Sequence, residues 1–536
     1  MKVADFFCGA GGFSEGFRQK GFNVVFALDN WKPAIETHHL NHPESNSVLM
    51  NILELDTPEK IDKIVPDTEV IVGSPPCISF SNSNRSGNAD KTLGLELIKS
   101  FLRIVAWKKK KGILKYWIME NVPNSLKYTK DKYSWKELGL KGKGPDLEIP
   151  KKVILNSADF GAPQIRKRFF AGDFPLPKET NEKKNYRKIK EIFESLGNPS
   201  NGKSKKIIKD PLYGFSLKKS ELTDHFYDNR IEEFEWKKAR NLKRDHGYMG
   251  RMSFPEEINR PSRTIMATMS ASTRESIIFL SFDSKNKKNG YRLPTIREAA
   301  CFMSFPIDYQ FEASGEGSKY RLVGNAVCPK LSGALAETIL EKENKRVKKN
   351  VGMRKIIFPK NNLNGVERKK KSFKKKKYES RFFDHIPHLK IRNYRVSLEN
   401  VDSNFEKKKI IWKCVLHHGT GKQASKLEVS ERMARKLVEN MPNFKKFESG
   451  LNKLFNKFKY NKNSLHESFL ENPFDGGPRE ILIKIKDIID TIYSNERFDN
   501  IELKHREKGF NIGNGTMPLK IGLALYGCSL FASKMN

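Results

Sequence analysis

Two residues capable of covalent and acid–base chemistry each come just after an apolar run. Cys77 follows residues 70–73, and the adjacent prolines Pro75 and Pro76 fix two φ angles and stop both helix and sheet. Glu120 directly follows another apolar run. Because ligands bind beyond the carboxyl ends of strands in open α/β sheets, we predict a nucleophilic thiol and a functional carboxyl there. From these residues alone, Cys77 could instead be a small buried hydrophobe, and Glu120 a helix cap or surface acid.

A glycine-rich turn opens the chain between a predicted strand and a predicted helix. The strand covers residues 2–7, residues 8–12 are Cys-Gly-Ala-Gly-Gly, and the helix is expected over residues 13–20. Glycines in such a turn let backbone N–H groups approach a ligand at the helix N-terminus. The next strand, residues 23–28, ends in Asp29, an acid placed to hold a ribose hydroxyl pair. Tight turns without a ligand have the same composition, but this spacing favours a nucleoside site.

Two arginines share one face of a further extended segment. Over residues 164–170, a period of two places Gln164, Arg166 and Arg168 on the same face. Two guanidinium groups side by side suit the clamping of a phosphate or carboxylate. A solvated edge strand would show the same pattern.

The elements that must position these residues alternate between strands and helices. Residues 47–64 form a further strand–helix unit with Asn51 near its strand end. Residues 93–107 repeat apolar side chains at close to the helical period, and residues 152–157 have the pattern of a strand. This alternation predicts an α/β fold.

These motifs occur in the order seen in the DNA cytosine-5 methyltransferases, which the chain resembles over about residues 1–345. The shared motifs are DFFCGAGG at 5–12, PCISFS at 76–81, ENV at 120–122, QIRKR at 164–168, RLPTIREAA at 292–300 and VGNAV at 323–327. The resemblance implies a Rossmann-like S-adenosylmethionine-dependent methyltransferase sheet of the α/β class with a smaller target recognition domain. The residues beyond it add a C-terminal domain that we expect to be mixed α/β.

The resemblance further implies that S-adenosylmethionine lies across the ends of the first strands. Phe7 would pack on the adenine, and Asp29 would hold the ribose. Asn51 stands where the family usually has an aspartate that accepts from the adenine amino group, and asparagine keeps an acceptor oxygen, so we expect binding to survive. The full set of expected cofactor-binding residues is Phe7, Gly9, Ala10, Gly11, Gly12, Asp29, Asn30, Asn51, Ile52, Pro76, Leu93, Asn325 and Ala326.

The same resemblance assigns the catalytic roles. The Cys77 thiolate would add to C6 of cytosine, and Glu120 would hydrogen-bond the ring at N3 while C5 takes the methyl group. Arg166 and Arg168 would orient the base and its flanking phosphate. Because none of these groups can reach a base stacked in a duplex, the target cytosine must be flipped out. No metal is expected to take part.

Motifs and composition together divide the chain into five segments. We expect a catalytic cofactor-binding domain over residues 1–174, a target recognition domain over 175–259 and the return of the catalytic domain over 260–345. A basic linker or arm should cover 346–383, and an accessory domain of no recognised family 384–536.

The recognition segment and the linker each allow a second interpretation. The former is polar, lysine-rich and interspersed with aromatic residues. The family resemblance implies that it faces the major groove and reads base edges there, and the alternative is a solvated insert. Residues 368–377 carry eight basic residues and should bind backbone phosphate as an arm, or serve only as a solubilising linker.

Charge and cysteine content narrow the choice of partner and compartment. Lys and Arg total 100 against 63 Asp and Glu, a formal net charge of +37, which makes a polyanion such as double-stranded DNA the expected partner. The six cysteines form no CxxC pair, so we expect a reducing cytoplasm and no structural zinc. We expect neither a signal peptide nor a membrane span, and a bacterial, nucleoid-associated location.

Two alternatives concern the substrate and the C-terminal residues. A relative that methylates transfer RNA uses similar motifs, so an RNA substrate stays open. Glu502-Leu503-Lys504, with Asp475 upstream, superficially matches restriction-type nucleases, and His417-His418 suggests a metal site without companion ligands. We favour an additional DNA-binding or partner-docking module over a fused nuclease.

Overall fold

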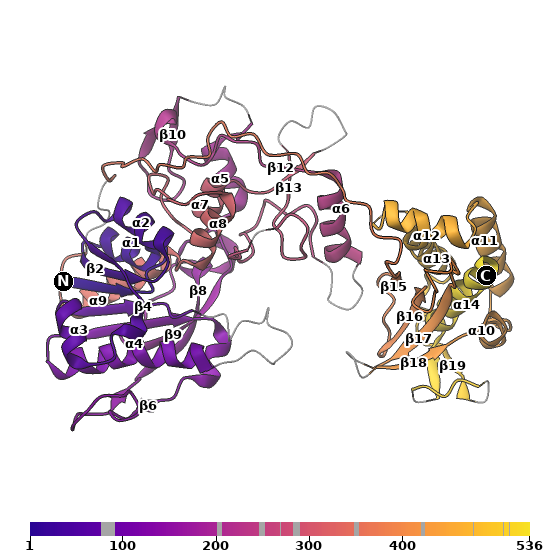
Figure 1. Cartoon of the computed structure of the whole chain (residues 1–536), viewed down its shortest axis with the longest axis horizontal. Coiled ribbons are helices and arrows are strands. Elements are labelled where there is room, and N and C mark those ends of the chain that lie inside the picture. The colour runs from indigo at the N-terminus through magenta and orange to yellow at the C-terminus, as the bar shows by residue number, and fades with distance from the viewer. Residues whose placement is uncertain are drawn as a thin grey trace. The chain divides into compact units, whose positions relative to one another are not determined.

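The chain divides into two compact units (Figure 1). The first consists of Met1–Ile231, Pro255–Ser270 and Ile277–Lys369, and the second of Glu232–Phe254, Ala271–Ser276 and Lys370–Asn536. This computed structural model describes residues 1–76, 92–200, 206–245, 252–268, 270–281, 290–347, 353–419, 424–474, 476–506, 509–513 and 515–536.

The first unit is built on a seven-stranded sheet in the order β3-β2-β1-β4-β5-β9-β8. The five strands from β3 to β5 run parallel, β9 is antiparallel to β5, and β8 is antiparallel to β9. The strands are β1 Lys2–Phe6, β2 Asn23–Asp29, β3 Asn46–Leu49, β4 Val70–Gly73, β5 Tyr116–Asn121, β8 Lys151–Asn156 and β9 Lys167–Asp173. The α/β class predicted from the sequence is confirmed.

The order of the strands defines where a ligand can bind. From β1 the sheet grows toward β2 on one side and toward β4 on the other, so the strand order reverses between β1 and β4. In open α/β sheets the crevice outside the carboxyl ends of the strands at such a reversal is the ligand-binding position. The glycine-rich turn follows β1, and the Pro75-Pro76 loop follows β4.

Helices cover both faces of this sheet, which explains why the central strands β4 and β5 are buried at every residue. In β5, Tyr116 and Ile118 belong to one hydrophobic core, whereas Trp117 and Met119 belong to another. The first core lies against α1 and α9, and the second against α3 and α4. The bounds of these four helices, and of α2, are α1 Gly12–Gln19, α2 Lys32–Asn41, α3 Pro58–Ile64, α4 Thr92–Lys110 and α9 Pro329–Lys342. Strands buried on both faces lose the alternation of polar and apolar residues.

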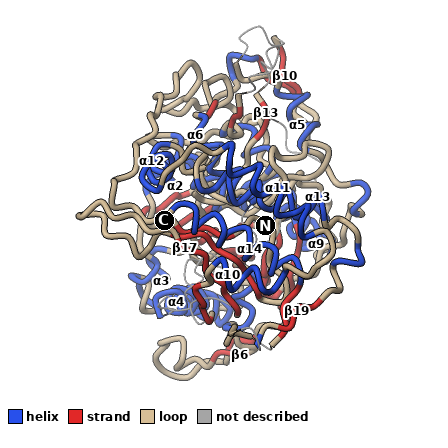
Figure 2. The backbone as a smooth tube through the Cα atoms, turned by 90° about the vertical axis from the view of Figure 1, so that its right-hand side faces the viewer, coloured by secondary structure: helices blue, strands red, loops and turns tan. Residues whose placement is uncertain are grey.

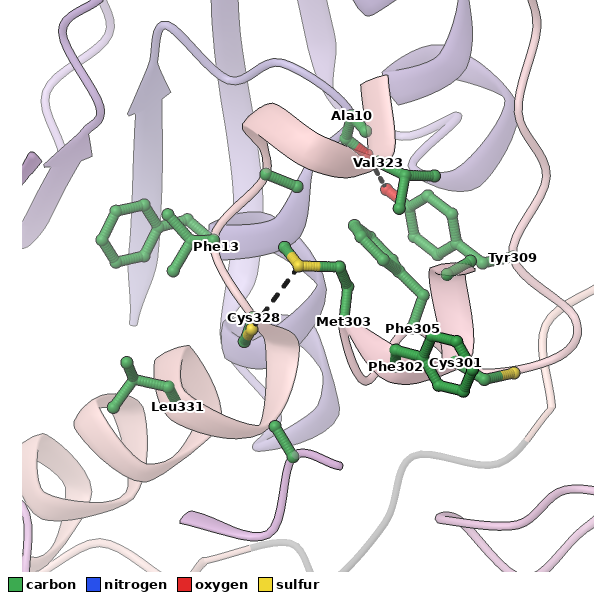
Figure 3. Close-up of a cluster of buried hydrophobic side chains, with 14 of the residues drawn as sticks. Ala10, Phe13, Cys301, Phe302, Met303, Phe305, Tyr309, Val323, Cys328 and Leu331 are labelled. Carbon is green, nitrogen blue, oxygen red and sulfur yellow. Dashed lines mark hydrogen bonds between the residues drawn. The ribbon is translucent and has the colours of Figure 1, made fainter. Parts of the chain in front are cut away.

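The end of the sheet domain returns to its beginning. A Cβ added at Gly12 would collide with the backbone of Val327, and one added at Gly16 with Ser332 of α9. Ser332 Oγ donates to the Gly12 carbonyl at 2.9 Å, and the Tyr309 hydroxyl donates to the Ala10 carbonyl (Figure 3). Only glycine at the start of α1 lets the two backbones come this close.

Smaller elements between residues 185 and 325 complete the first unit. They are held by fully buried ion pairs, Arg292 with Glu298 at 2.7 Å and Lys319 with Asp224 at 2.7 Å. The elements are α5 Ile189–Leu196, β10 Ile207–Lys209, β11 Ser216–Lys218, β12 Arg230–Ile231, β13 Phe279–Leu280, β14 Tyr291–Arg292, α7 Ile296–Phe302 and α8 Glu316–Asn325. A two-stranded ribbon, β6 Lys132–Tyr133 and β7 Leu147–Glu148, lies outside the main sheet.

The second unit is a mixed α/β domain centred on its last helix, α14 Leu519–Met535. Residues 519–532 of α14 are buried except Lys520, and the helix packs on β16, β17, α10 and α13 (Figure 2). The antiparallel sheet is β15 Phe383–His385, β16 Tyr394–Glu399, β17 Lys413–His418 and β18 Ser425–Glu428. The other elements are α6 Glu233–Arg240, α10 Glu431–Val438, α11 Phe444–Lys457, α12 Lys462–Glu471, α13 Pro478–Ile492, β19 Glu502–Lys504 and β20 Thr516–Pro518.

The compact units do not follow the segments drawn from the sequence. Residues 353–369 of the expected linker belong to the first unit, and residues 370–383 belong to the second. Part of the expected recognition segment, Glu232–Phe254, also belongs to the second unit. Over the described residues, no helix is long and apolar enough to cross a membrane.

A buried histidine lies behind the glycine-rich turn. His38 of α2 is fully buried, and its ring hydrogen-bonds Ser47 Oγ at 2.8 Å and Ser14 Oγ at 3.0 Å. Ser14 Oγ in turn donates to Asp5 Oδ2 at 2.7 Å. Burial lowers the pKa of His38 from 6.5 to about 3, and the neighbouring His39 adds to this. As the pH falls below 6.5, His38 therefore takes up a proton in the unfolded chain but stays neutral in the folded protein until the pH is near 3.

We predict that His38 weakens the fold as the pH falls. The unfolded chain takes up this proton near pH 6.5 and the folded chain only near pH 3, so between these values acid favours unfolding. From pH 7 to pH 5 the cost is about 2 kcal/mol. In urea titrations at pH 7 and at pH 5, His38→Gln should lose less stability between the two conditions than the natural chain does, by about this amount. The exposed His39→Gln is the control, and an equal loss in the natural chain and His38→Gln would contradict the prediction.

Candidate functional site

The glycine-rich turn is held in shape by the acid at the end of β2. Gly9 and Gly11 have φ of 53° and 82°, values that favour glycine, and Phe7 reaches a φ of 52°. The backbone N–H of Gly9 donates to Asp29 Oδ2 at 2.9 Å, and that of Trp31 donates to Asp29 Oδ1 at 2.9 Å. Burial raises the pKa of Asp29, against the effect of these hydrogen bonds. The structure thus brings the predicted turn and the predicted acid into direct contact.

Two half-buried aromatic residues lie at the ends of the same strands. Phe7 directly follows β1, and Trp31 follows Asp29 by two residues. Arg321 of α8 lies over the Trp31 ring, 5.5 Å from its centroid. The sequence analysis did not assign Trp31, although an aromatic residue just past a strand-end acid is a usable signal for a stacking site. Partly exposed rings at this edge can stack on a planar base.

The other expected cofactor residues lie at the same end of the sheet with different exposure. Asn51, where a short 3₁₀ turn begins, accepts from the Leu53 N–H at 3.1 Å, while Ile52 is buried. Asn30 is exposed. Asn325 is exposed at the end of α8, and Ala326 after it is buried. Ala10 is buried, with its carbonyl bonded to Tyr309.

The loop that should carry the nucleophile is described only at its beginning. Residues 77–91 lie outside the described residues, and Cys77 is among them. Pro76 and Leu93, near the borders of that stretch, are both exposed. The Asn121 side-chain amide donates to the Pro75 carbonyl at 3.1 Å. Asn121, which the sequence analysis quoted without a role, therefore fixes the start of this loop to the end of β5.

The predicted carboxyl forms an ion pair across the β5–β9 strand pair. Arg168 Nε lies 3.1 Å from Glu120 Oε1, and Glu120 is 6% exposed. Burial raises the pKa of Glu120, and the positive charges of Arg168 and Arg166 oppose that rise. Burial thus favours the protonated form of this carboxyl, and the two guanidinium groups favour its ionised form.

Arg166 has a different position from Arg168. It is 2% exposed, and its guanidinium donates to the carbonyls of Ile265 at 3.2 Å, Gly324 at 2.9 Å and Ala326 at 3.1 Å. Strand β9 begins only at Lys167, but burial alternates with the predicted period of two across its start: Gln164 and Arg166 are buried and Arg168 is half-buried, whereas Ile165 and Lys167 are exposed. Arg166 ties the residues before β9 to the end of α8, and its role toward a base stays a prediction.

The C-terminal residues suspected of metal chemistry have protein partners instead. Glu502 pairs with Arg392 at 2.8 Å, and His417 hydrogen-bonds Ser397 Oγ at 2.8 Å. Asp475 lies outside the described residues. Within the part of the chain that the structure describes, no group of three or more His, Cys, Asp or Glu side chains is arranged to hold a metal ion.

Comparisons with known proteins agree on one family. The family described as C-5 cytosine-specific DNA methylase matches residues 1–341. Type II methyltransferase M.MthTI of Methanothermobacter thermautotrophicus is 30% identical over 347 residues, 63% of this chain and 97% of that protein. M.DdeI of Desulfomicrobium norvegicum is 27% identical over 384 residues, 63% of this chain and 88% of that protein. The crystal structure of S. pombe Dnmt2 methyltransferase covers 64% of this chain and 99% of its own, with 17% identity and a TM-score of 0.43.

We predict that removing the Arg166 guanidinium destabilises the first unit. Arg166→Met removes the guanidinium that donates to the carbonyls of Ile265, Gly324 and Ala326, which should lower the free energy of unfolding by about 3 kcal/mol. Chemical denaturation of the full-length protein measures this loss. The matched control is Lys167→Ala, an exposed neighbour whose loss should stay within about 0.5 kcal/mol. Equal stability of the two variants would show that the Arg166 hydrogen bonds do not support the fold.

Proposed function

Because this chain belongs to the C-5 cytosine-specific DNA methylase family, we propose that it transfers a methyl group from S-adenosylmethionine to C5 of a cytosine in duplex DNA. The observation that carries the proposal is the buried Glu120–Arg168 pair, which lies at the carboxyl end of β5. The adjacent residue, Asn121, holds the loop that leads to Cys77. We further propose that the protein marks DNA in a restriction–modification or defence setting.

The cofactor site is proposed at the strand reversal between β1 and β4. The residues there fit a nucleoside with a charged tail: the Gly9–Gly12 backbone at the start of α1, the Asp29 carboxylate, and the half-buried rings of Phe7 and Trp31. The carboxylate that orders the turn would also accept from ribose hydroxyls through its remaining lone pairs. S-adenosylmethionine supplies an electrophilic methyl group when bound.

The chemistry proposed for this chain begins with a sulfur nucleophile. Cytosine C5 is a poor nucleophile, and addition of the Cys77 thiolate to C6 forms a C–S bond that makes C5 enamine-like. C5 then takes the methyl group, and S-adenosylhomocysteine leaves as a neutral thioether. A base removes the proton from C5, the C6–S bond breaks, and Cys77 is released as the thiolate.

Glu120 is proposed to be the acid in this sequence. When sulfur attacks C6, negative charge develops on the ring, and a protonated Glu120 at N3 neutralises it. Burial favours that protonated form, while Arg168 keeps the pKa from rising too far. The target base must leave the duplex to reach these groups, so we include base flipping in the proposal.

Replacing the thiol should separate binding from chemistry. We predict that Cys77→Ala abolishes methyl transfer to unmethylated DNA in a tritium-incorporation assay and leaves binding of DNA and S-adenosylmethionine within about threefold. DNA carrying 5-fluorocytosine should form a denaturation-resistant adduct with the natural chain, because fluorine at C5 blocks the final elimination. No adduct should form with Cys77→Ala, and methyl transfer by that variant would refute the mechanism.

The pH dependence of methyl transfer should report the Glu120–Arg168 pair. Activity should fall on the alkaline side as Glu120 loses its proton. Since the Arg168 charge lowers the pKa of Glu120, Arg168→Ala should move this fall to higher pH and reduce the maximal rate about 10–100-fold. Lys167→Ala, an exposed neighbour on β9, should leave the profile unchanged. An alkaline limb that stays in place, or moves to lower pH, would remove Glu120 from this role.

The substrate alternatives stay predictions. Measuring methyl incorporation into duplex DNA and into RNA under the same conditions separates DNA from RNA. A Mg²⁺-dependent cleavage that disappears in Glu502→Ala would support a fused nuclease, although Glu502 is already paired with Arg392. Bisulfite sequencing of DNA from cells that express the protein would identify the modified site.

A further inference from the structure

One helix of the middle of the chain packs with the C-terminal residues. Helix α6 lies between the two halves of the family-matched sheet domain in sequence, yet it belongs to the second unit. Asn241, directly after α6, donates through Nδ2 to the Phe474 carbonyl at 2.8 Å. Glu235 of α6 is buried and pairs with Lys371 at 3.0 Å. These contacts join segments more than 130 residues apart.

An aromatic cluster forms the centre of this association. The Phe373 ring lies between Phe234 of α6 and Phe474, with centroid distances of 5.8 and 6.3 Å. Beside it, Trp236 of α6 stacks on Phe254 at 6.3 Å. Half-buried rings at these distances pack by burial of apolar surface and by favourable ring geometry. Helix α6 is thus part of the hydrophobic structure of the second unit.

The basic run expected to be a free arm is fixed by the same cluster. Phe373 lies in the middle of residues 368–377, and the Lys376 N–H donates to the Leu470 carbonyl at 3.2 Å. Lys376 Nζ lies 4.4 Å from the centroid of the Phe469 ring. Burial lowers the pKa of Lys376, and Lys238 of α6 lowers it further, so the α6 ammonium lies near the run. The side chains of Lys370, Lys374 and Lys377 around this anchor are exposed.

We use the name basic ridge for the exposed side chains of Lys238, Lys370, Lys374 and Lys377. The ridge leaves out Lys371 and Lys375 of the basic run, because they pair with Glu235 and Glu471.

A surface groove of about 340 Å³ is also lined by residues of both segments, Glu232–Phe254 and Lys370–Asn536. It is lined by Arg240 and Arg244 from the middle segment and by Pro387, His388, Ile483, Lys486, Asp487 and Asp490. The groove carries charges of both signs.

We propose that Glu232–Phe254 and Lys370–Asn536 form one DNA-binding module whose basic ridge binds backbone phosphates of the duplex that is methylated. The proposal rests on the proposed function for its choice of DNA. Four exposed ammonium groups on a fixed support match the regular negative charge of a duplex, and fixing them beforehand avoids an entropy cost on binding. The α6 segment is interposed within the catalytic sequence, so the module is joined to the catalytic unit on both sides of α6.

The test compares two quadruple variants of the full chain. The ridge variant changes Lys238, Lys370, Lys374 and Lys377 to Ala. The matched control changes Lys445, Lys446, Lys453 and Lys457 to Ala, four exposed lysines of α11 in the same unit. Binding to a fluorescein-labelled 30-base-pair duplex of mixed sequence is measured by anisotropy from 50 to 200 mM salt, without S-adenosylmethionine. Thermal unfolding of each variant confirms that it is folded.

The expected result is specific to the ridge. Its variant should bind about tenfold more weakly at 100 mM salt, and the slope of log K against log salt should fall by about 0.9 for each lost phosphate contact. The α11 control should stay within twofold. Unchanged affinity of the ridge variant, an equal loss in the control, or tighter binding of a matched RNA duplex by the natural chain would each overturn the proposal.

The assay also separates this proposal from the proposed function. Binding is measured without methyl transfer, so a chain that binds through the ridge but transfers no methyl group would refute only the activity. A second variant, Phe373→Ala, tests the support. It keeps all four lysines but removes the ring between Phe234 and Phe474. It should lose part of the affinity with no change in charge, and full affinity in this variant would refute the fixed ridge.

Discussion

The close contact between Gly12 and the backbone of Val327 is the constraint on which the first unit depends. It places the residues before α9, more than 300 positions along the chain, directly against the turn that follows β1. All strands of the main sheet other than β1 lie between these two positions in the sequence. The turn that Asp29 orders from one side is thus covered on the other side by residues from near the end of the family-matched region.

The positively charged residues differ in burial and therefore in the groups that they contact. Arg166 and Arg292 are buried and donate to carbonyls or a carboxylate of other elements, so they hold these elements together. Arg168 is partly exposed and faces the Glu120 carboxyl, whose pKa its charge lowers. Exposed lysines such as Lys374 remain available to a polyanion. The total of 100 Lys and Arg therefore overstates the number of cations available to a polyanion, because some of them neutralise buried acids, and the net charge of +37 already allows for such pairs.

Much of the sheet domain could be predicted from the sequence because its signals are local. Apolar runs gave the strands near residues 2–7, 23–28 and 116–119, and the glycine turn and Asp29 stand at their ends. The part played by Asn121 could not be derived, because its partner is a carbonyl 46 residues away. The arginine segment keeps its predicted period of two in the alternation of burial from Gln164 to Arg168, although the strand begins only at Lys167. The packing of α6 with residues beyond 370 depends on tertiary contacts between half-buried rings, which no periodicity records.

The chain passes between the two units at residues 231/232, 254/255, 270/271, 276/277 and 369/370. A single tether lets a module sample a large volume, whereas several connections confine it and raise its effective concentration at a shared ligand. The same connectivity means that the second unit cannot be exchanged by a single cut and join, because α6 would have to be carried along with its C-terminal partners. A change in either unit must therefore keep the chain segments that form the second one compatible with the sheet-domain residues between them in the sequence.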